Sequence, residues 1–254
     1  MKCLFNIFSV FGANFIRIIL VGVLLYGLSF SAYAQDDEFD YNEEISYGVQ
    51  INTVGGVIGG GMIKYAKLVN DRRFRLLSFE IVNIKHPKEV RGLASPNASP
   101  FIFGKSNYLF SLRPQYGQEF LLFKKASEEG VHINAVVASG ISIGVTKPYY
   151  VYYDSLNLNG TTISVPYTTS LRDDYILGPG NFLDGINQLD FHPGLHFKGG
   201  LNFEFGRFNN SVVGLEVGFM IEKFFSKSLV LMPRAERINQ FNSLYLTFYY
   251  GKKY

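Results

Sequence analysis

Four histidines are the side chains of this 254-residue chain best suited to binding a metal or moving a proton: His86, His132, His192 and His196. No pair of them lies on a predicted metal-binding helix, and the one cysteine, Cys3, stands far upstream of all four. Zinc sites take three or four nitrogen, sulfur or carboxylate ligands held close together. The sequence therefore predicts no metal site, and nothing in it indicates a bound cofactor.

The sequence also gives little support for a phosphate-binding loop or for a catalytic triad. The glycine run at 59–61 does not lead into a helix that begins with Lys-Ser or Lys-Thr, so it is not a phosphate-binding P-loop. His86 or His192 could pair with a serine and a carboxylate, as acyl-transfer catalysis requires, but the spacing marks no such trio. We expect the protein not to be an enzyme.

The stretch VVGLEVGFMIEKFF, residues 212–225, places two glutamates inside an apolar run. Leu215 and Val217 fall on one parity, whereas Glu216 and Glu222 share the other parity with glycines. A period of two is typical of a β-strand whose two faces meet different surroundings. The sequence therefore predicts that a β-strand positions the two glutamates, on the face opposite Leu215 and Val217.

Similar alternation recurs along the chain and predicts eight strands, at 45–53, 57–67, 75–82, 107–123, 131–146, 195–206, 212–225 and 243–254. From the second onward, the connections between them alternate short and long. Bacterial outer-membrane barrels have tight periplasmic turns, longer external loops and an even number of strands. We therefore predict an all-β fold: an eight-stranded antiparallel up-and-down transmembrane β-barrel over residues 44–254, with both ends in the periplasm.

The polar face of these strands is rich in glycine, as at Gly140, Gly144 and Gly200. A narrow closed lumen needs small residues beside a few large ones, because an eight-stranded barrel is only wide enough for its own side chains. The apolar face should then meet lipid. Charged side chains on the inward face should form a network of ion pairs, since an unpaired buried charge is costly. That lumen network comprises Lys64, Glu80, Arg113, Glu119, Lys198, Glu204, Glu216 and Glu222.

Two prolines complicate the strand pattern. Pro114 lies inside the fourth strand, where a closed barrel has no free edge, so we expect a β-bulge there. After Pro148 the tyrosine-rich segment 149–154 could extend the fifth strand and supply aromatic residues at the membrane interface. The sequence leaves a ten-stranded barrel open as the alternative.

The N-terminus has the form of a secretory signal peptide. A basic start precedes an apolar core at 18–30, and Ala32 and Ala34 provide an A-x-A cleavage site. We expect residues 1–34 to be removed during export, and residues 35–43 to form an acidic periplasmic lead-in. The alternative is an uncleaved anchor, but the apolar core is shorter than the ~20 residues of a membrane-spanning helix.

The composition supports the same interpretation. Cleavage would take Lys2 and Arg17 from the 24 basic residues, leaving 22 against 21 acidic residues. Such a balance argues against a nucleic-acid partner. Without Cys3 the mature chain has no disulfide, so an exported chain of this kind must bury a large core or sit in a membrane.

The predicted external loops are where binding should lie, because loops on a rigid scaffold usually carry function. Two loop segments, IKHPKEVR and MPRAER, are locally basic. Arg and Lys side chains suit lipopolysaccharide phosphates, although a solvated loop with no ligand is the simpler interpretation. The residues expected to make this contact are Lys85, His86, Lys88, Arg91, Arg234 and Arg237.

The segments 47–56, 84–91 and 103–117, together with the closing strand, resemble small outer-membrane β-barrel proteins. The resemblance is to the OmpA/OmpX and PorT-like kind, in an uncharacterised branch of Bacteroidetes type. It covers most of residues 44–254 and implies the barrel fold without any catalytic signature. It also implies that the barrel-assembly machinery reads the final strand through Phe248, Tyr250 and the terminal Tyr254.

Together these features predict an integral protein of the bacterial outer membrane with a plugged polar lumen. Its expected role is structural or binding, through external loops that contact lipid and lipopolysaccharide; the sequence names no protein partner. A narrow channel for small solutes and a lipid-modifying enzyme are the alternative functions. A soluble secreted β-barrel, with the apolar face inside, is the alternative fold.

Overall fold

The computed structural model describes residues 42–70, 72–96, 98–123, 131–155, 161–208, 211–226 and 229–254. These residues belong to one compact unit, Glu38–Tyr254, whereas the unit Met1–Asp37 lies outside the described residues. The predicted signal peptide and most of the predicted lead-in are therefore also outside them. No helix in the described part of the chain is long and apolar enough to cross a membrane.

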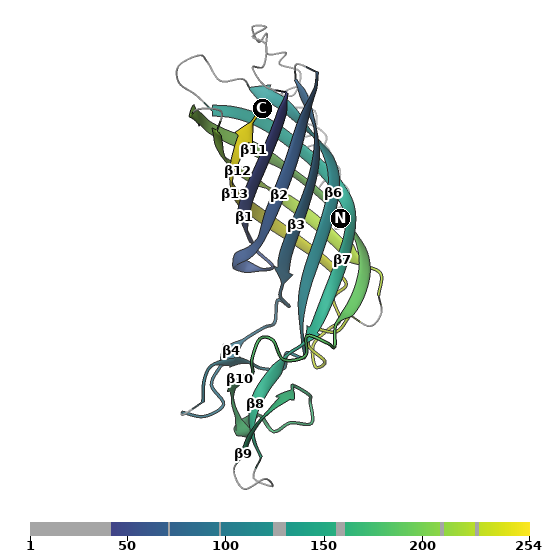
Figure 1. Ribbon diagram of the computed structural model, residues 1–254. Coiled ribbons are helices and arrows are strands. Elements are labelled where there is room, and N and C mark those ends of the chain that lie inside the picture. Colours follow the sequence, from purple (N-terminus) through teal and green to yellow (C-terminus); the bar gives the residue numbers. More distant parts are fainter. Residues whose placement is uncertain are drawn as a thin grey trace, which may run out of the picture. The chain divides into compact units, whose positions relative to one another are not determined.

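Eight strands close into an antiparallel barrel in which each strand pairs with the barrel strands before and after it, and the first pairs with the last (Figure 1). This confirms the predicted eight-stranded up-and-down barrel. Backbone bonds at Tyr254 complete the seam, since its N–H donates to Glu43 O at 2.8 Å. The strands are β1 (Glu43–Asn52), β2 (Gly56–Asn70), β3 (Arg73–Ile84), β6 (Asn107–Phe123), β7 (Val131–Pro148), β11 (Asp190–Phe208), β12 (Ser211–Phe224) and β13 (Gln240–Lys253).

The connections divide the barrel into two different ends. At the long-loop end the strands are joined by residues 53–55, 85–106, 149–189 and 225–239. The short-turn end has the brief connections and both ends of the barrel sheet, Glu43 and Lys253. The sheet therefore has the alternation of connections that the sequence predicts from the second onward.

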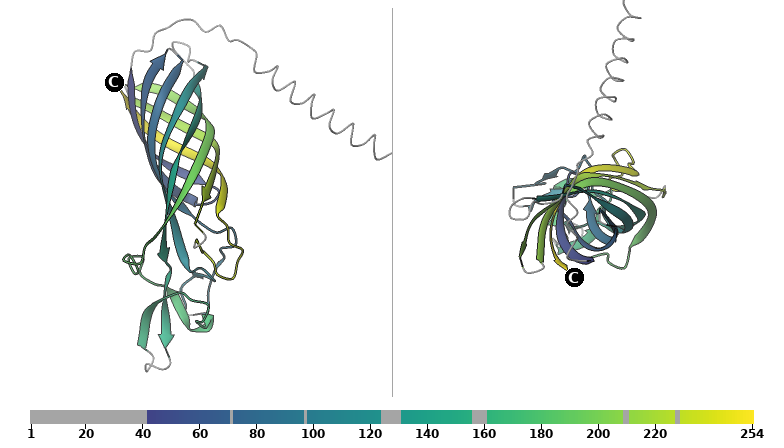
Figure 2. Two further views of the ribbon diagram at one scale, coloured as in Figure 1. Left: turned by 90° about the vertical axis from the view of Figure 1, so that its right-hand side faces the viewer. Right: turned by 90° about the horizontal axis from the view of Figure 1, so that it is seen from above.

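The long loops contain a second, smaller sheet (Figure 2). Its order is β10-β8-β9, from β10 (Ile176–Pro179), β8 (Tyr150–Ser155) and β9 (Thr161–Pro166). The pair β4 (Arg91–Gly92) and β5 (Phe101–Ile102) and the 3-10 turn η2 (Asp173–Tyr175) complete the loop elements. Because β8 pairs in this sheet, the tyrosine-rich segment does not add strands to the barrel. The barrel therefore has eight strands and not ten.

The barrel is apolar outside and polar inside. Along β3, for example, Leu77, Phe79 and Ile81 are exposed, whereas Glu80 between them is fully buried. The strand parity thus points large apolar side chains outward around the whole sheet. Exposed side chains of this kind on the eight strands include Ile45, Tyr47, Val49, Ile63, Leu77, Phe79, Ile81, Tyr116, Phe120, Val137, Ile141, Leu195, Phe197, Leu201, Val213, Val217, Phe219, Ile221, Leu244, Phe248 and Tyr250.

The expected bulge at Pro114 is wrong. The register of β6 with β7 is the same on both sides of the proline, from Leu112↔Ile143 to Gln115↔Gly140, so no residue is inserted. The β6–β7 pairing omits Arg113 and Pro114, whereas on the β3 side both stay in register, with the proline opposite Phe79. A missing N–H is therefore accommodated by a local gap in one ladder. The irregularity of β6 lies nearer the short-turn end, between Leu121 and Phe123.

Candidate functional site

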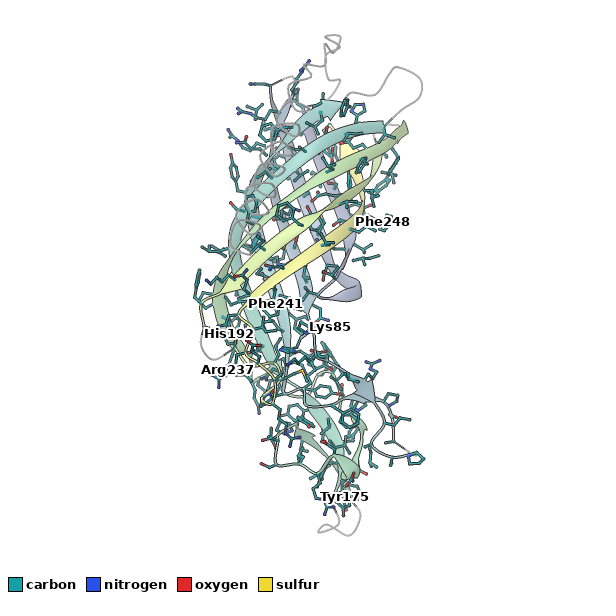
Figure 3. All side chains as sticks on the ribbon, turned by 180° about the vertical axis from the view of Figure 1, so that it is seen from behind. Lys85, Tyr175, His192, Arg237, Phe241 and Phe248 are labelled. Atoms are coloured by element: carbon teal, nitrogen blue, oxygen red, sulfur yellow. The ribbon has the colours of Figure 1, made fainter. Side chains whose placement is uncertain are left out.

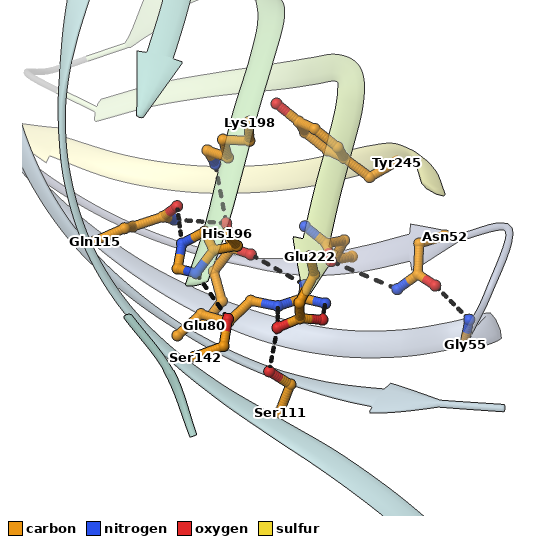
Figure 4. A network of polar contacts seen from close by, with 12 residues as sticks. Asn52, Gly55, Glu80, Ser111, Gln115, Ser142, His196, Lys198, Glu222 and Tyr245 are labelled. Carbon is orange, nitrogen blue, oxygen red and sulfur yellow. Dashed lines mark hydrogen bonds and ion pairs between the residues drawn. The ribbon is translucent and has the colours of Figure 1, made fainter. Parts of the chain in front are cut away.

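The barrel interior contains a polar cluster whose centre is an arginine–carboxylate pair (Figure 4). Arg113 Nε donates to Glu222 Oε1 at 3.0 Å, and Nη2 donates to Oε2 at 2.6 Å. Ser111 Oγ donates to the same carboxylate at 2.6 Å. Because Ser111 and Arg113 lie two apart on β6, the strand period points both side chains at Glu222 on β12.

A lysine bridges two further carboxylates beside this pair. Lys198 Nζ lies 2.9 Å from both Glu80 Oε1 and Glu216 Oε1. Glu80 also accepts from Gln115 Nε2 at 2.8 Å, and its other oxygen lies 3.7 Å from Arg113 Nη1. The contact with Arg113 joins the lysine bridge to the arginine pair, so these groups form one connected set.

A second set of ion pairs lies nearer the short-turn end. Lys64 Nζ is 3.3 Å from Glu119 and 3.7 Å from Glu44. Lys253 Nζ is 2.6 Å from Glu204 and 3.9 Å from the same Glu44. Glu119 is also hydrogen-bonded by two asparagine amides, because Asn134 and Asn202 each donate to its Oε1.

All eight residues predicted to face the lumen are buried, and the structure brings them into these two sets. Sequence reasoning missed Glu44 and Lys253, which are equally buried and join the second set. The sequence pattern could have identified them. The alternation of β1 and β13, continued to the strand ends, places both residues on the inward parity.

Two inward tyrosines fill much of the remaining space. Tyr245 OH donates to Glu216 at 2.8 Å, and Tyr249 OH donates to Asn202 at 2.7 Å. Their rings fit because glycine stands opposite, since a Cβ at Gly214 would overlap the Tyr249 ring. The inward glycines therefore make room for particular aromatic rings.

Apolar layers flank the polar cluster inside the barrel, and the sequence analysis did not anticipate them. At the short-turn end Phe74, Leu76 and Val136 are buried together. At the long-loop end Phe224 and Phe241, packed at 6.1 Å between ring centroids, belong to a buried group made up of Ile84, Leu109, Phe224, Leu229, Leu231 and Phe241. Leu229 and Leu231 come from the loop 225–239, so this loop enters the layer.

The buried histidines do not form a triad. His196 Nδ1 lies 3.0 Å from Ser142 Oγ, but its Nε2 faces the amide oxygen of Gln115 at 3.2 Å. A triad places a carboxylate at that position to orient the imidazole. His192, four residues before His196 on β11, pairs instead with Thr146 Oγ1 at 2.9 Å. Among the described residues no three His, Cys, Asp or Glu side chains are grouped to hold a metal ion.

The long loops pack on one another. Their own buried core is separate from the apolar layer at the long-loop end of the barrel. Phe101, Tyr149, Val151, Tyr167 and Ile176 form a buried core within loops 85–106 and 149–189. The tyrosines of the segment 149–154 are thus only partly at the surface: Tyr149 is buried, and its hydroxyl accepts from Ile102 N–H at 3.2 Å. Burial raises the pKa of both Tyr149 and Tyr167.

A buried ion pair holds the base of these loops. Lys105 Nζ lies 2.9 Å from both carboxylate oxygens of Glu89 and 4.5 Å from the centroid of the Tyr108 ring. Burial of the amine lowers the pKa of Lys105 in spite of the glutamate. Ser106 N–H donates to Leu231 O at 2.8 Å and ties loop 85–106 to loop 225–239.

Five of the six residues predicted to contact lipopolysaccharide are exposed: Lys85, Lys88, Arg91, Arg234 and Arg237. His86 departs from that prediction because it is buried. Its Nε2 lies 3.1 Å from the carbonyl oxygen of Glu236, and its Nδ1 accepts from Lys88 N–H at 3.1 Å. The imidazole therefore joins two loops and is not available to a surface ligand. Arg234 donates to Thr169 O at 3.1 Å, which connects the third loop.

The three aromatic residues of the predicted assembly signal are all exposed. Phe248 and Tyr250 project outward from β13, and Tyr254 follows the strand (Figure 3 labels Phe248). Tyr250 packs against Tyr47 of β1 at 5.7 Å between ring centroids. The three residues predicted to form this signal therefore lie at the seam where the barrel closes.

No protein-family profile matches the chain, and no curated protein matches it. Solved structures do show a likeness in fold. Neisserial surface protein A is 10% identical with a TM-score of 0.37, over 84% of this chain and 97% of that one. Ail, the attachment invasion locus protein of Yersinia pestis, in complex with the heparin analogue sucrose octasulfate, is 12% identical with a TM-score of 0.39, over 86% of this chain and 100% of that one.

Proposed function

We propose that this protein is an integral barrel of the bacterial outer membrane with a closed lumen, and that it acts by binding through its long loops. One observation carries the proposal: ion-paired side chains lie inside the barrel, and large apolar side chains lie exposed on its outer wall. Soluble monomers rarely expose a contiguous apolar patch above a few hundred Å². A lipid-facing wall with a polar interior is the arrangement of transmembrane barrels.

The outer membrane is the proposed location because bacterial barrels of this connectivity reside there. The long-loop end then faces outward and the short-turn end faces the periplasm. We also propose that the chain is exported through the predicted signal peptide and folded by the barrel-assembly machinery. In this proposal it is related to the OmpA/OmpX and PorT-like barrels.

The proposed lumen is closed to solutes. Two apolar layers and the tyrosine rings occupy the interior beside the ion pairs, and each of the eight charged residues predicted for the lumen lies within 4 Å of a counter-charge. Ions would have to replace these contacts to pass. This arrangement favours a structural interior over the alternative of a narrow channel.

The binding surface is proposed to be the outer face of the packed loops. Lys88, Arg91, Arg234 and Arg237 are exposed there, and their side chains suit phosphate groups of lipopolysaccharide. The buried core and the Lys105–Glu89 pair hold the loop backbone, so the surface is preorganised for a ligand. The Ser142–His196 contact, buried in the lumen and lacking a carboxylate partner on the ring, gives little support to a lipid-modifying enzyme.

Three measurements test the proposal together. An unboiled outer-membrane sample should change mobility on boiling, and the purified barrel should add no conductance to a planar bilayer. Binding to immobilised lipopolysaccharide should fall at least tenfold when Lys88, Arg91, Arg234 and Arg237 are all changed to Gln. A control with Lys67, Arg72, Arg75 and Lys252 changed to Gln, all near the short-turn end, should bind as the unmodified protein does. A soluble protein, a conducting barrel or equal loss in the control would each contradict the corresponding part.

A further inference from the structure

A groove runs over the outer wall of the barrel along β2, where Gly59, Gly60 and Gly61 line it and Gly61, on the outward parity, has no side chain. Its volume is about 560 Å³, and its lining is almost entirely apolar. Ile63, Phe79, Ile81 and Phe110 form its sides. Since these side chains belong to the outward parity, the groove is continuous with the apolar wall proposed to face lipid.

Gly61 forms the open floor of the groove. It lies between Val49 of β1 and Ile81 of β3 in the sheet register, where the neighbouring outward residues carry large side chains. A Cβ at Gly61 would meet only Gly48 O, at 3.7 Å, so the space above this position is free. A side chain at Gly61 would therefore occupy the groove without disturbing the strand.

The end of the groove toward the long loops is polar. Asn83 lines it, and the buried Oδ1 of Asn83 has no hydrogen-bond partner among the described residues. Lys85 follows two residues later on the same parity and is exposed (Figure 3). Its Nζ lies beside Gly56 at the start of β2, since a Cβ at Gly56 would be 2.9 Å from it, and this places the ammonium beyond the residues that line the groove.

The two polar groups have complementary requirements. An amide oxygen accepts a hydrogen bond, so Asn83 Oδ1 requires a hydroxyl or another donor. The Lys85 ammonium donates and carries a positive charge, so it favours a phosphate. A second outward groove of about 410 Å³, over Gly48 and Gly214, has no unpartnered side-chain amide in its lining.

We propose that the groove over Gly61 is a binding site for one phosphate-bearing membrane lipid. One acyl chain lies over Gly61 between Ile63 and Ile81, the headgroup hydroxyl meets the Asn83 amide at the end of the groove once that side chain turns its oxygen outward, and the phosphate pairs with Lys85 beyond the groove. This inference rests on the proposed membrane location, because only there does a lipid acyl chain meet the wall. It adds a defined lipid site to a wall that would otherwise contact lipids without selection.

Native mass spectrometry of the detergent-purified protein tests the site. The protein is mixed with equal amounts of phosphatidylglycerol and phosphatidylcholine of identical acyl chains, and the retained lipid is identified. The unmodified protein should retain one phosphatidylglycerol in preference to phosphatidylcholine. Gly61→Leu should lower retention of both lipids at least tenfold. Lys85→Gln should keep retention but reduce the preference for phosphatidylglycerol to less than twofold.

Two matched variants control for the substitutions themselves. Gly199→Leu places leucine on the outer wall of β11, where its Cβ would first meet the Phe219 ring at 3.3 Å, and Lys223→Gln removes an exposed lysine from β12. Both should retain lipid as the unmodified protein does. Every variant is first required to change mobility on boiling. A folded Gly61→Leu that retains lipid as well as Gly199→Leu would overturn this inference alone, whereas a soluble, unshifted unmodified protein would overturn the membrane proposal beneath it.

Discussion

Arg113 and Glu222 face each other across the barrel interior and form a two-pronged ion pair, with contacts of 3.0 and 2.6 Å. Both side chains are almost completely buried. Removing one partner of such a pair leaves an uncompensated charge and typically costs about 3–5 kcal/mol, whereas replacing both by apolar residues is often nearly neutral. The pair therefore makes the interior sensitive to single substitutions.

Arg113→Met should lower the free energy of unfolding by about 3–5 kcal/mol because it strands Glu222. Arg113→Met combined with Glu222→Met should cost much less than the sum of the two single substitutions. Urea titration of the barrel in lipid vesicles, followed by its mobility on unboiled gels, measures both. Additive losses in the double variant would show that the pair is not coupled.

A prediction about packing concerns Gly214 and the Tyr249 ring. Gly214→Ala should destabilise the barrel by about 1–3 kcal/mol, because the added methyl overlaps the ring and overpacking has this cost. Adding Tyr249→Leu should recover part of the loss by opening space. The same urea titration applies, with Gly61→Ala as the control that enters open space. If Gly61→Ala costs as much as Gly214→Ala, the ring contact is not the cause.

The base of the long loops depends on the Glu89–Lys105 pair. Glu89→Gln should leave a buried ammonium without its counter-charge and loosen the loops by about 3–5 kcal/mol. Limited proteolysis should then cut within 85–106 much faster, while the barrel still shifts on boiling. Glu89→Gln with Lys105→Met should restore most of the resistance. Unchanged cleavage in Glu89→Gln would mean that the aromatic core alone holds the loops.

The closing strand allows a test of assembly. Tyr254→Ala keeps the backbone bonds to Glu43 but removes the terminal ring, so we expect a several-fold lower yield of folded barrel in cells. Refolding of the purified variant into detergent should be unaffected. Tyr116→Ala, an equally outward tyrosine on β6, serves as the control and should assemble normally. If Tyr254→Ala also refolds poorly into detergent, the lower yield in cells would come from reduced stability of the barrel and not from lost recognition by the assembly machinery.

Where polar and apolar residues alternate clearly, the alternation was enough to predict which side of the wall a strand residue occupies. Glu80, for example, follows from Phe79 and Ile81 on the opposite parity. Parity does not give depth along the barrel. Phe74 and Leu76 share the inward parity of Glu80, and polarity alone could not show that they form an apolar layer near the turn.

Loop contacts could not be read from the sequence because they join distant segments. His86 looks like an exposed basic residue in the segment 84–91, but its ring is buried against the carbonyl oxygen of Glu236, 150 residues away. Tyr149 similarly enters a core with Phe101. Pro114 was misjudged for a local reason, since a missing donor can be tolerated by leaving two ladder positions, Arg113 and Pro114, unpaired and without a bulge.

The most direct test of the proposed membrane-embedded barrel uses the fact that the chain contains no tryptophan. Phe248 and Tyr249 are consecutive on β13, one exposed outside and the other buried inside. Phe248→Trp and Tyr249→Trp, each reconstituted in vesicles containing brominated phosphatidylcholine, report which side meets the acyl chains. Strong quenching at position 248 and weak quenching at 249 is the predicted result. Equal quenching at both positions, or stronger quenching at 249, would contradict a barrel that faces lipid with its apolar wall.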